Sequence, residues 1–139
     1  MSKMKVLREH LASSKVFLSM KFLVLLLGLS WKMFIRSWRD ADVQAHLGNK
    51  EIVFQLQTKN ARISRHFCVS KRRINSHWGC HAEPALTIIF STAVIGTRIL
   101  TSDGKRLAFM QGMQNKEVAV EGDLSLFPWY VELGSMLNR

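Results

Sequence analysis

The residue types best suited to chemistry lie in the middle of the chain, where three histidines and two cysteines fall within sixteen positions. His66 stands two residues before Cys68, and His77 is followed by Cys80 and His81. Imidazole nitrogen and thiolate sulfur are the usual ligands of tetrahedral zinc. Their spacing differs from that of zinc fingers and zinc ribbons, since the sequence contains no Cys-x-x-Cys pair. We therefore favour surface histidines and reduced thiols over a metal site, and we expect no cofactor.

No sequence motif indicates catalysis. The chain lacks a Gly-rich phosphate loop, a Gly-x-Ser-x-Gly nucleophile elbow and a His-Glu-x-x-His pattern. Its ten acidic residues do not cluster near a histidine within an apolar segment, which is the arrangement that general acid–base catalysis would need. A non-enzymatic function is predicted.

The net charge of +10 is concentrated in the N-terminal half. Residues 1–39 hold eight Lys or Arg and one acid, whereas residues 83–139 hold five and six. Such a field attracts anionic lipid head groups, nucleic acid or an acidic partner. Lys71, Arg72 and Arg73 fall in a predicted turn, and the most basic segment is also the most apolar. This combination favours lipid over nucleic acid as the partner.

The elements that must carry these residues begin with a long apolar segment at residues 16–38, which contains no proline and is predicted to be a helix. Only ten uncharged residues separate Lys21 from Lys32, about half of the roughly 20 that a transmembrane span requires. A tilted span with its lysines snorkelling to the interface stays open. No convincing cleavable signal is present, and we expect a cytoplasmic protein peripheral to the inner membrane.

The polar residues of this helix form one narrow stripe, because at about 100° per residue Ser14, Lys21, Gly28, Lys32 and Arg39 share a side. A helix with a thin basic stripe and a broad apolar surface can lie in a membrane interface. Packing on the sheet of its own domain is the alternative, and the two are compatible. The residues predicted to dock on an anionic membrane are Lys21, Trp31, Lys32, Phe34, Arg36, Trp38 and Arg39.

Residues 40–139 are predicted to form a separate domain of α+β class. Strands are expected at residues 51–58, 63–70, 74–78, 85–90 and 117–121, and helices at 41–47, 92–101, 105–111 and 124–137. The first three strands alternate apolar and polar residues and are joined by tight polar turns, which is typical of an antiparallel meander. We expect an antiparallel-dominated five-stranded sheet covered by helices on one face.

Three segments of the C-terminal half carry a family resemblance: Pro84–Ser91, Leu107–Gly112 and Val118–Leu126. Together they resemble the type two sterol carrier protein family of lipid-transfer domains, with a Pro-x-hydrophobic-Thr-hydrophobic strand, an Ala-Phe-x-x-Gly step and a strand ending in Gly-Asp. The likeness covers roughly residues 40–137. The chain departs from the pattern at residues 113–116, which intervene before the last strand, and in its apolar N-terminal helix.

The resemblance implies an apolar tunnel between the sheet and the C-terminal helices, which binds a sterol, acyl chain or isoprenoid-like lipid without chemistry. Flexible methionines and aromatic rings suit such a ligand. The residues expected to bind it are Ile99, Leu100, Leu107, Phe109, Met110, Met113, Leu124, Phe127, Trp129, Tyr130, Leu133 and Met136.

Two functional hypotheses follow. In the first, the protein binds, transfers or presents a lipid while its N-terminal helix docks on the membrane. In the second, the fold is the same but the helix contacts a protein, so that the chain is a structural accessory subunit of a membrane-associated complex.

Overall fold

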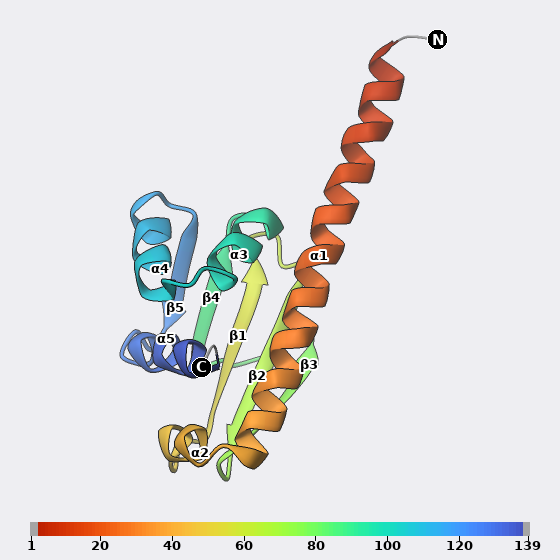
Figure 1. Ribbon diagram of the computed structural model, residues 1–139. Helices are drawn as coiled ribbons and strands as arrows, with labels where there is room; N and C mark the ends of the chain where they lie inside the picture. The colour runs from red at the N-terminus through yellow and green to blue at the C-terminus, as the bar shows by residue number, and fades with distance from the viewer. Residues whose placement is uncertain (1–2, 138–139) are drawn as a thin grey trace.

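The computed structural model describes the backbone of residues 3–137 and the side chains of residues 17–137. Five helices and five strands follow one another in these residues (Figure 1). They are α1 (Lys3–Arg39), α2 (Ala41–Leu47), β1 (Ile52–Thr58), β2 (Ser64–Ser70), β3 (Arg73–Trp78), β4 (Leu86–Phe90), α3 (Ala93–Leu100), α4 (Lys105–Gln114), β5 (Val118–Gly122) and α5 (Leu126–Leu137). Every strand and helix predicted from the sequence is present.

The strands form one mixed sheet in the order β3-β2-β1-β4-β5. β1 and β4 run parallel, and the other neighbouring strands are antiparallel. The prediction of an α+β fold with an antiparallel-dominated five-stranded sheet is confirmed, and β1 is its middle strand. The helices lie on one face, with α1 alongside β2 and β3 and with α3, α4 and α5 toward β4 and β5 (Figure 1).

The connection from β3 to β4 must cross the sheet, because β3 is an edge strand and β4 lies beyond β1. Residues 79–85 cross on the face opposite the helices. His66 Nδ1 lies 2.9 Å from the carbonyl oxygen of Gly79, and the amide of His81 donates to Gln55 Oε1 at 2.8 Å. This segment therefore covers part of the polar face. Its His81 amide gives the buried Gln55 side chain a hydrogen-bond donor.

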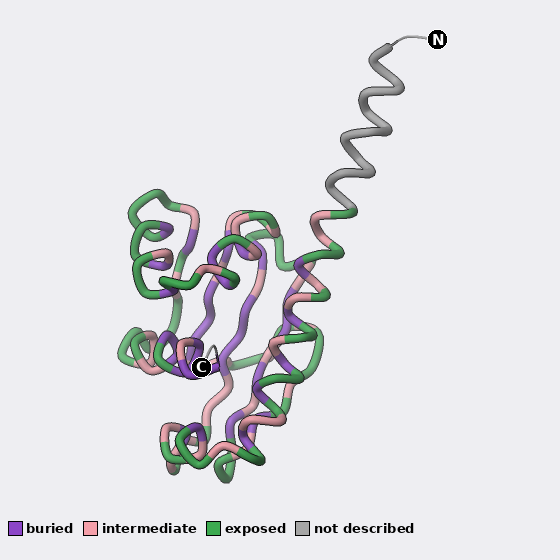
Figure 2. Tube along the Cα trace, in the orientation of Figure 1, coloured by how far each residue is buried: buried purple, intermediate pink, exposed green. Residues whose placement is uncertain are grey.

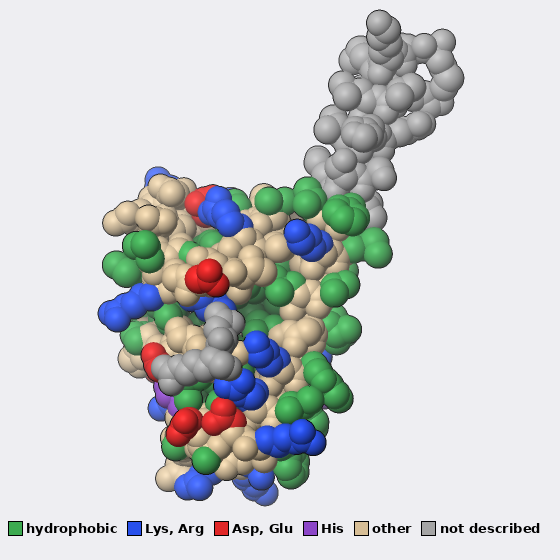
Figure 3. Space-filling view, in the orientation of Figure 1, with side chains coloured by type: hydrophobic (Ala, Val, Ile, Leu, Met, Phe, Trp, Pro, Cys, Tyr) green, Lys and Arg blue, Asp and Glu red, His purple; other side chains and the backbone are tan. Residues whose placement is uncertain are grey.

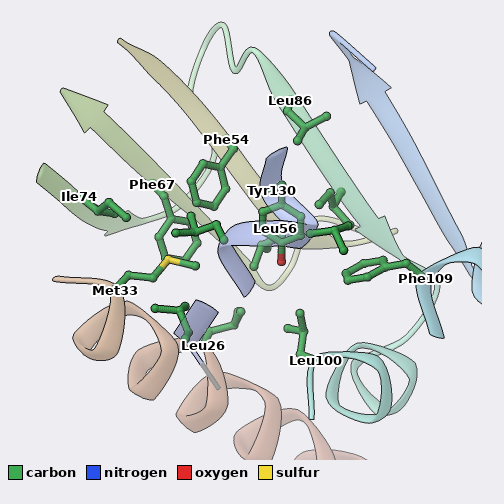
Figure 4. Packing of buried hydrophobic residues seen from close by; sticks show 14 of the residues in the cluster. Leu26, Met33, Phe54, Leu56, Phe67, Ile74, Leu86, Leu100, Phe109 and Tyr130 are labelled. Carbon is green, nitrogen blue, oxygen red and sulfur yellow. The ribbon is translucent and has the colours of Figure 1, made fainter. Parts of the chain in front are cut away.

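The core lies between the sheet and the helices. On the helix-facing side of β1 and β2, Phe54 stacks on Phe67 with ring centroids 4.9 Å apart. Phe22, Leu26 and Met33 of α1 belong to the same buried cluster (Figure 4). The strand alternation predicted from the sequence is confirmed by this burial. One cluster thus contains side chains from the segments before and after residue 40.

Helix α1 extends further toward the N-terminus than the predicted 16–38. Over its described side chains it buries one row, with Phe22, Leu26, Ser30, Met33 and Ser37 at spacings of three and four residues (Figure 2). This spacing keeps a row on one side of a helix. The other described side chains of the helix are half-buried or exposed, and Leu25 and Leu29 among them pack against the core.

By length and composition, residues 17–39 are sufficient to cross a membrane, although the buried row packs against the sheet. Arg36 fixes the end of the helix, since its Nε is 3.0 Å from Asp40 Oδ2. The same carboxylate caps α2 by accepting from the amides of Asp42 and Val43, and the resulting contacts lower the pKa of Asp40 although desolvation opposes them. The turn is therefore rigidly specified.

Candidate functional site

A groove of about 1050 Å³ lies between helix α1 and the strands β2 and β3. Its helix side is formed by Val24, Leu27, Gly28, Ser30, Trp31 and Phe34. Its strand side is formed at the β3 edge of the sheet by Arg65 and Ser76 on the helix-facing side and by Cys68, Asn75 and His77 on the other side. The volume is within the range of pockets that hold small molecules. One wall is apolar and the other is polar, which suits an amphipathic molecule.

The apolar wall belongs to a longer row on the outside of α1, which we call the exposed row. It consists of Phe17, Met20, Val24, Leu27, Trp31, Phe34 and Trp38. Between 38% and 68% of each residue's surface is accessible. Hydrophobic side chains follow this edge of the molecule in Figure 3, with Lys and Arg among them. A contiguous apolar surface of this kind marks an interaction site.

Aromatic contacts order the C-terminal half of the exposed row. Trp31 stacks on Phe34 with centroids 6.1 Å apart, and Phe34 lies 6.3 Å from Trp38. The guanidinium of Arg73, from the edge strand, sits 4.2 Å over the Trp38 ring and donates to the carbonyl of Ser37. The rings are thus held against the helix before anything binds them.

Arg65 stands at the polar wall with only 8% of its surface exposed. Its Nε donates to Ser30 Oγ at 2.6 Å, and its Nη2 donates to Ser76 Oγ at 2.8 Å. Its guanidinium carbon lies 4.5 Å over the ring of Trp78, its cross-strand neighbour. These three contacts fix the plane of the guanidinium.

No carboxylate among the described side chains forms an ion pair with Arg65. Burial lowers the pKa of Arg65, yet a guanidinium remains charged in proteins. The groove therefore contains a fixed positive charge whose described partners are neutral hydroxyls and a π-face.

Ser30 and Arg65 are brought together by their positions on the inward-facing sides of α1 and β2. Arg65 occupies a helix-facing position of β2, two residues from Phe67 on the same side. Ser30 occupies the buried row of α1, where its hydroxyl donates to the carbonyl of Leu26 at 2.7 Å while accepting from Arg65. The sequence analysis did not identify Arg65 as a site residue. A cation at an apolar position of a strand was the available signal.

Six of the seven predicted docking residues lie on the exposed side of α1: Lys21, Trp31, Lys32, Phe34, Trp38 and Arg39. Arg36 differs, since it is half-buried, pairs with Asp40 and donates to the carbonyl of Met136 at 2.8 Å. It joins α1 to α5 and so has a structural role. Ser14, which was expected on the same polar stripe, lies outside the side chains that are described.

The twelve predicted ligand-binding residues are not gathered around one cavity. Six belong to the core: Ile99, Leu100, Phe109, Tyr130, Leu133 and Met136. Four are exposed: Leu107, Met110, Met113 and Leu124. Phe127 and Trp129 are partly buried. None of the twelve lines the groove beside α1.

The aromatic core residues among the twelve pack against other aromatic side chains of the protein. The Phe109 ring meets Phe127 edge-on at 5.5 Å and Tyr130 at 5.9 Å. Trp129 stacks on His46 at 5.5 Å, and its indole Nε1 donates to the carbonyl of His46 at 3.0 Å. These rings hold α4 and α5 against the sheet and α2. All of these ring contacts are made within the protein.

The histidines of the central segment do come together on the polar face. The ring centroid of His66 is 5.5 Å from that of His77 and 5.4 Å from that of His81. Within the described part of the chain, no group of three or more His, Cys, Asp or Glu side chains has an arrangement that could hold a metal ion. Cys68 and Cys80 are both free thiols.

No protein-family model matches the chain, and no curated protein matches it. Solved structures do. The UbiJ-SCP2 ubiquinone synthesis protein is 15% identical with a TM-score of 0.63, and the match covers 83% of this chain and 92% of that one. The sterol carrier protein domain 2 of Helicoverpa armigera is 12% identical with a TM-score of 0.50, covering 77% and 84%.

A third match is the sec-alkylsulfatase Pisa1 from Pseudomonas sp., at 12% identity and a TM-score of 0.51. It covers 73% of this chain but 15% of the sulfatase. The chain therefore has the fold of type two sterol carrier proteins, as the resemblance predicted. At these identities the likeness concerns the fold, so function must be argued from the site.

Proposed function

We propose that this protein is a non-catalytic lipid-binding protein that docks on a membrane through the exposed row of α1. The lipid lies in the groove beside that helix. One observation carries the proposal: the apolar wall of the groove is part of the exposed row, so a chain leaving the bilayer can enter the groove without crossing water. Burial of apolar surface contributes about 25 cal/mol per Å².

The fold supports the lipid-binding part of the proposal, and the charge supports the docking part. Lys21, Lys32 and Arg39 flank the exposed row on the same helix, at the level where they would meet phosphate groups. The net charge of the chain is +10. We place the protein in the cytoplasm, on the inner membrane. The positive charge supports this location, because the cytoplasmic leaflet carries anionic lipids.

Vesicle flotation tests the proposal with the full chain and vesicles containing anionic lipid. We expect Trp31→Ser combined with Trp38→Ser to lower the vesicle-bound fraction at least tenfold, because aromatic side chains supply most of the interfacial apolar area. Leu107→Ser is the matched control, since Leu107 is 60% exposed on α4, outside the row. Equal flotation of the double variant and the wild type would reject docking through α1.

A second function is favoured by the spacing of the exposed row. Its seven members recur at alternating intervals of three and four residues, the pattern with which one helix packs against another. A helical protein partner in a membrane-associated complex would use the same face. In that case the chain would be recovered with a protein and would fail to float with protein-free vesicles.

A further inference from the structure

We infer that the groove selects an amphiphile with a long apolar tail and an anionic carboxylate or phosphate head, and that Arg65 binds the head. This inference rests on the proposed lipid-binding function and names the class of lipid. The tail would lie against the apolar wall of α1, and the head would meet the polar wall formed by β2 and β3.

Charge complementarity is the first argument. Arg65 is 92% removed from solvent relative to full exposure, given its 8% relative accessibility, and its described partners are two neutral hydroxyls and an indole ring. A buried charge is ordinarily paired, because an unpaired one costs several kcal/mol. An anionic head group in the groove supplies the missing counter-charge.

Geometry is the second argument. Ser30 and Ser76 engage Nε and Nη2 from two different elements, α1 and β3, while Trp78 supports one face of the guanidinium plane at 4.5 Å. No hydrogen bond joins Nη1 to a described side chain. The planar fork of arginine suits carboxylate and phosphate oxygens. The group is thus oriented before the anion arrives, which lowers the entropic cost of binding.

The shape of the groove selects an amphiphile over a free anion. Val24, Leu27, Trp31 and Phe34 form the apolar wall of the groove on the exposed side of α1, and a small anion would leave that wall in water. A neutral lipid would cover the wall but would leave Arg65 without a counter-charge. Only a molecule with both parts satisfies both walls.

Arg73 provides a matched control for Arg65. It also stacks on a tryptophan, with 4.2 Å to the Trp38 ring, and it also donates to α1. It does not line the groove. Removing either charge lowers the net charge by one, so a difference between the two variants reports position and not total charge.

The experiment measures the binding of oleate and of oleyl alcohol to the purified, delipidated full chain by the change in tryptophan fluorescence. We expect the wild type and Arg73→Gln to bind oleate at least tenfold more tightly than the alcohol. Arg65→Gln should lose that preference, because charge-assisted hydrogen bonds contribute about 10- to 100-fold in affinity. Inorganic phosphate at the same concentration should not displace oleate.

The outcomes separate this inference from the proposed function. Equal binding of oleate and oleyl alcohol by the wild type overturns the anionic head and leaves lipid binding standing. Failure of both probes to bind overturns both. Persistence of the oleate preference in Arg65→Gln assigns the anion elsewhere. If Arg65→Gln does not fold, Arg65→Met, which keeps the apolar stem, and Arg65→Lys, which keeps the charge, should respectively lose and partly retain the preference.

Discussion

At the scale of single residues, two serines decide how Arg65 can be buried. The Ser30 hydroxyl donates to a helix carbonyl and accepts from Arg65 Nε, so one side chain closes two hydrogen-bonding requirements. Ser76 Oγ, on the neighbouring strand β3, accepts from Arg65 Nη2. Replacing either serine with alanine would leave a guanidinium N–H without an acceptor, a cost of about 1–3 kcal/mol.

The stability of the fold at alkaline pH is expected to depend on Tyr130. Tyr130 is the only tyrosine in the chain, is 3% exposed, and has its pKa raised by burial. Because the folded-state pKa exceeds the unfolded value of about 10, the stabilisation from the neutral phenol is complete below pH ~10 and is lost as the pH rises further. We expect tyrosinate absorbance to appear only together with alkaline unfolding.

The measurement is a titration of ultraviolet absorbance alongside circular dichroism. Tyr130→Phe should unfold at higher pH than the wild type, since it has no phenol to ionise. The difference between the two proteins isolates Tyr130 from Lys105, whose pKa burial lowers. A phenol that ionises near pH 10 while the dichroism stays native would contradict the prediction.

At the scale of elements, α1 has two apolar sides with different roles. Phe22, Leu26 and Met33 face the core, whereas Leu27 and Trp31 face outward. The sequence predicted the helix and its thin polar stripe, because charges are sparse and their angles are easily calculated. It could not tell which apolar side is buried, since leucine and phenylalanine occur on both sides and only the position of the sheet distinguishes them.

The junction of α1 and α3 depends on Gly96. A Cβ at this position would lie 2.5 Å from a ring carbon of Phe22, so Gly96→Ala must displace the ring or the helix. We expect a loss of about 1–3 kcal/mol in the free energy of unfolding, measured by denaturant titration.

Gly28→Ala is the matched control, because a Cβ there meets nothing within 4 Å. Alanine exceeds glycine in helix propensity by about 1 kcal/mol, so this variant should be more stable than the wild type. If both variants shift stability in the same direction by the same amount, the contact between α1 and α3 is not the cause.

At the scale of the whole molecule, the sheet could be predicted and the groove could not. Alternating residues such as Ile52, Phe54 and Leu56 indicate the buried face of a strand directly, and short polar turns indicate hairpins. The groove arises where α1 runs beside the edge strand β3, and no local pattern encodes that placement. For the same reason, the pattern could not distinguish core positions from ligand-lining ones among the twelve residues expected to bind a lipid, of which six belong to the core.

The uneven charge of the molecule predicts salt-sensitive membrane binding. The chain carries 20 Lys or Arg against 10 acids, and raising the salt from about 0.1 M to about 1 M shortens the Debye length from about 10 to about 3 Å. We expect the fraction bound to anionic vesicles to fall severalfold over this range, and binding to zwitterionic vesicles to be weak throughout. Flotation at a series of salt concentrations measures it, and binding that is insensitive to salt would contradict the prediction.

The order of strands in the sheet also sets an order of events during folding. β1, β2 and β3 are sequential neighbours, so their pairing closes short loops and can begin early. The pairing of β4 with β1 spans the two hairpins and residues 79–85, and the pairing of β5 with β4 spans α3 and α4, so both close longer loops. We therefore expect kinetic measurements to find the β1–β2 and β2–β3 hairpins formed in the transition state and the pairings of β4 with β1 and β5 still absent.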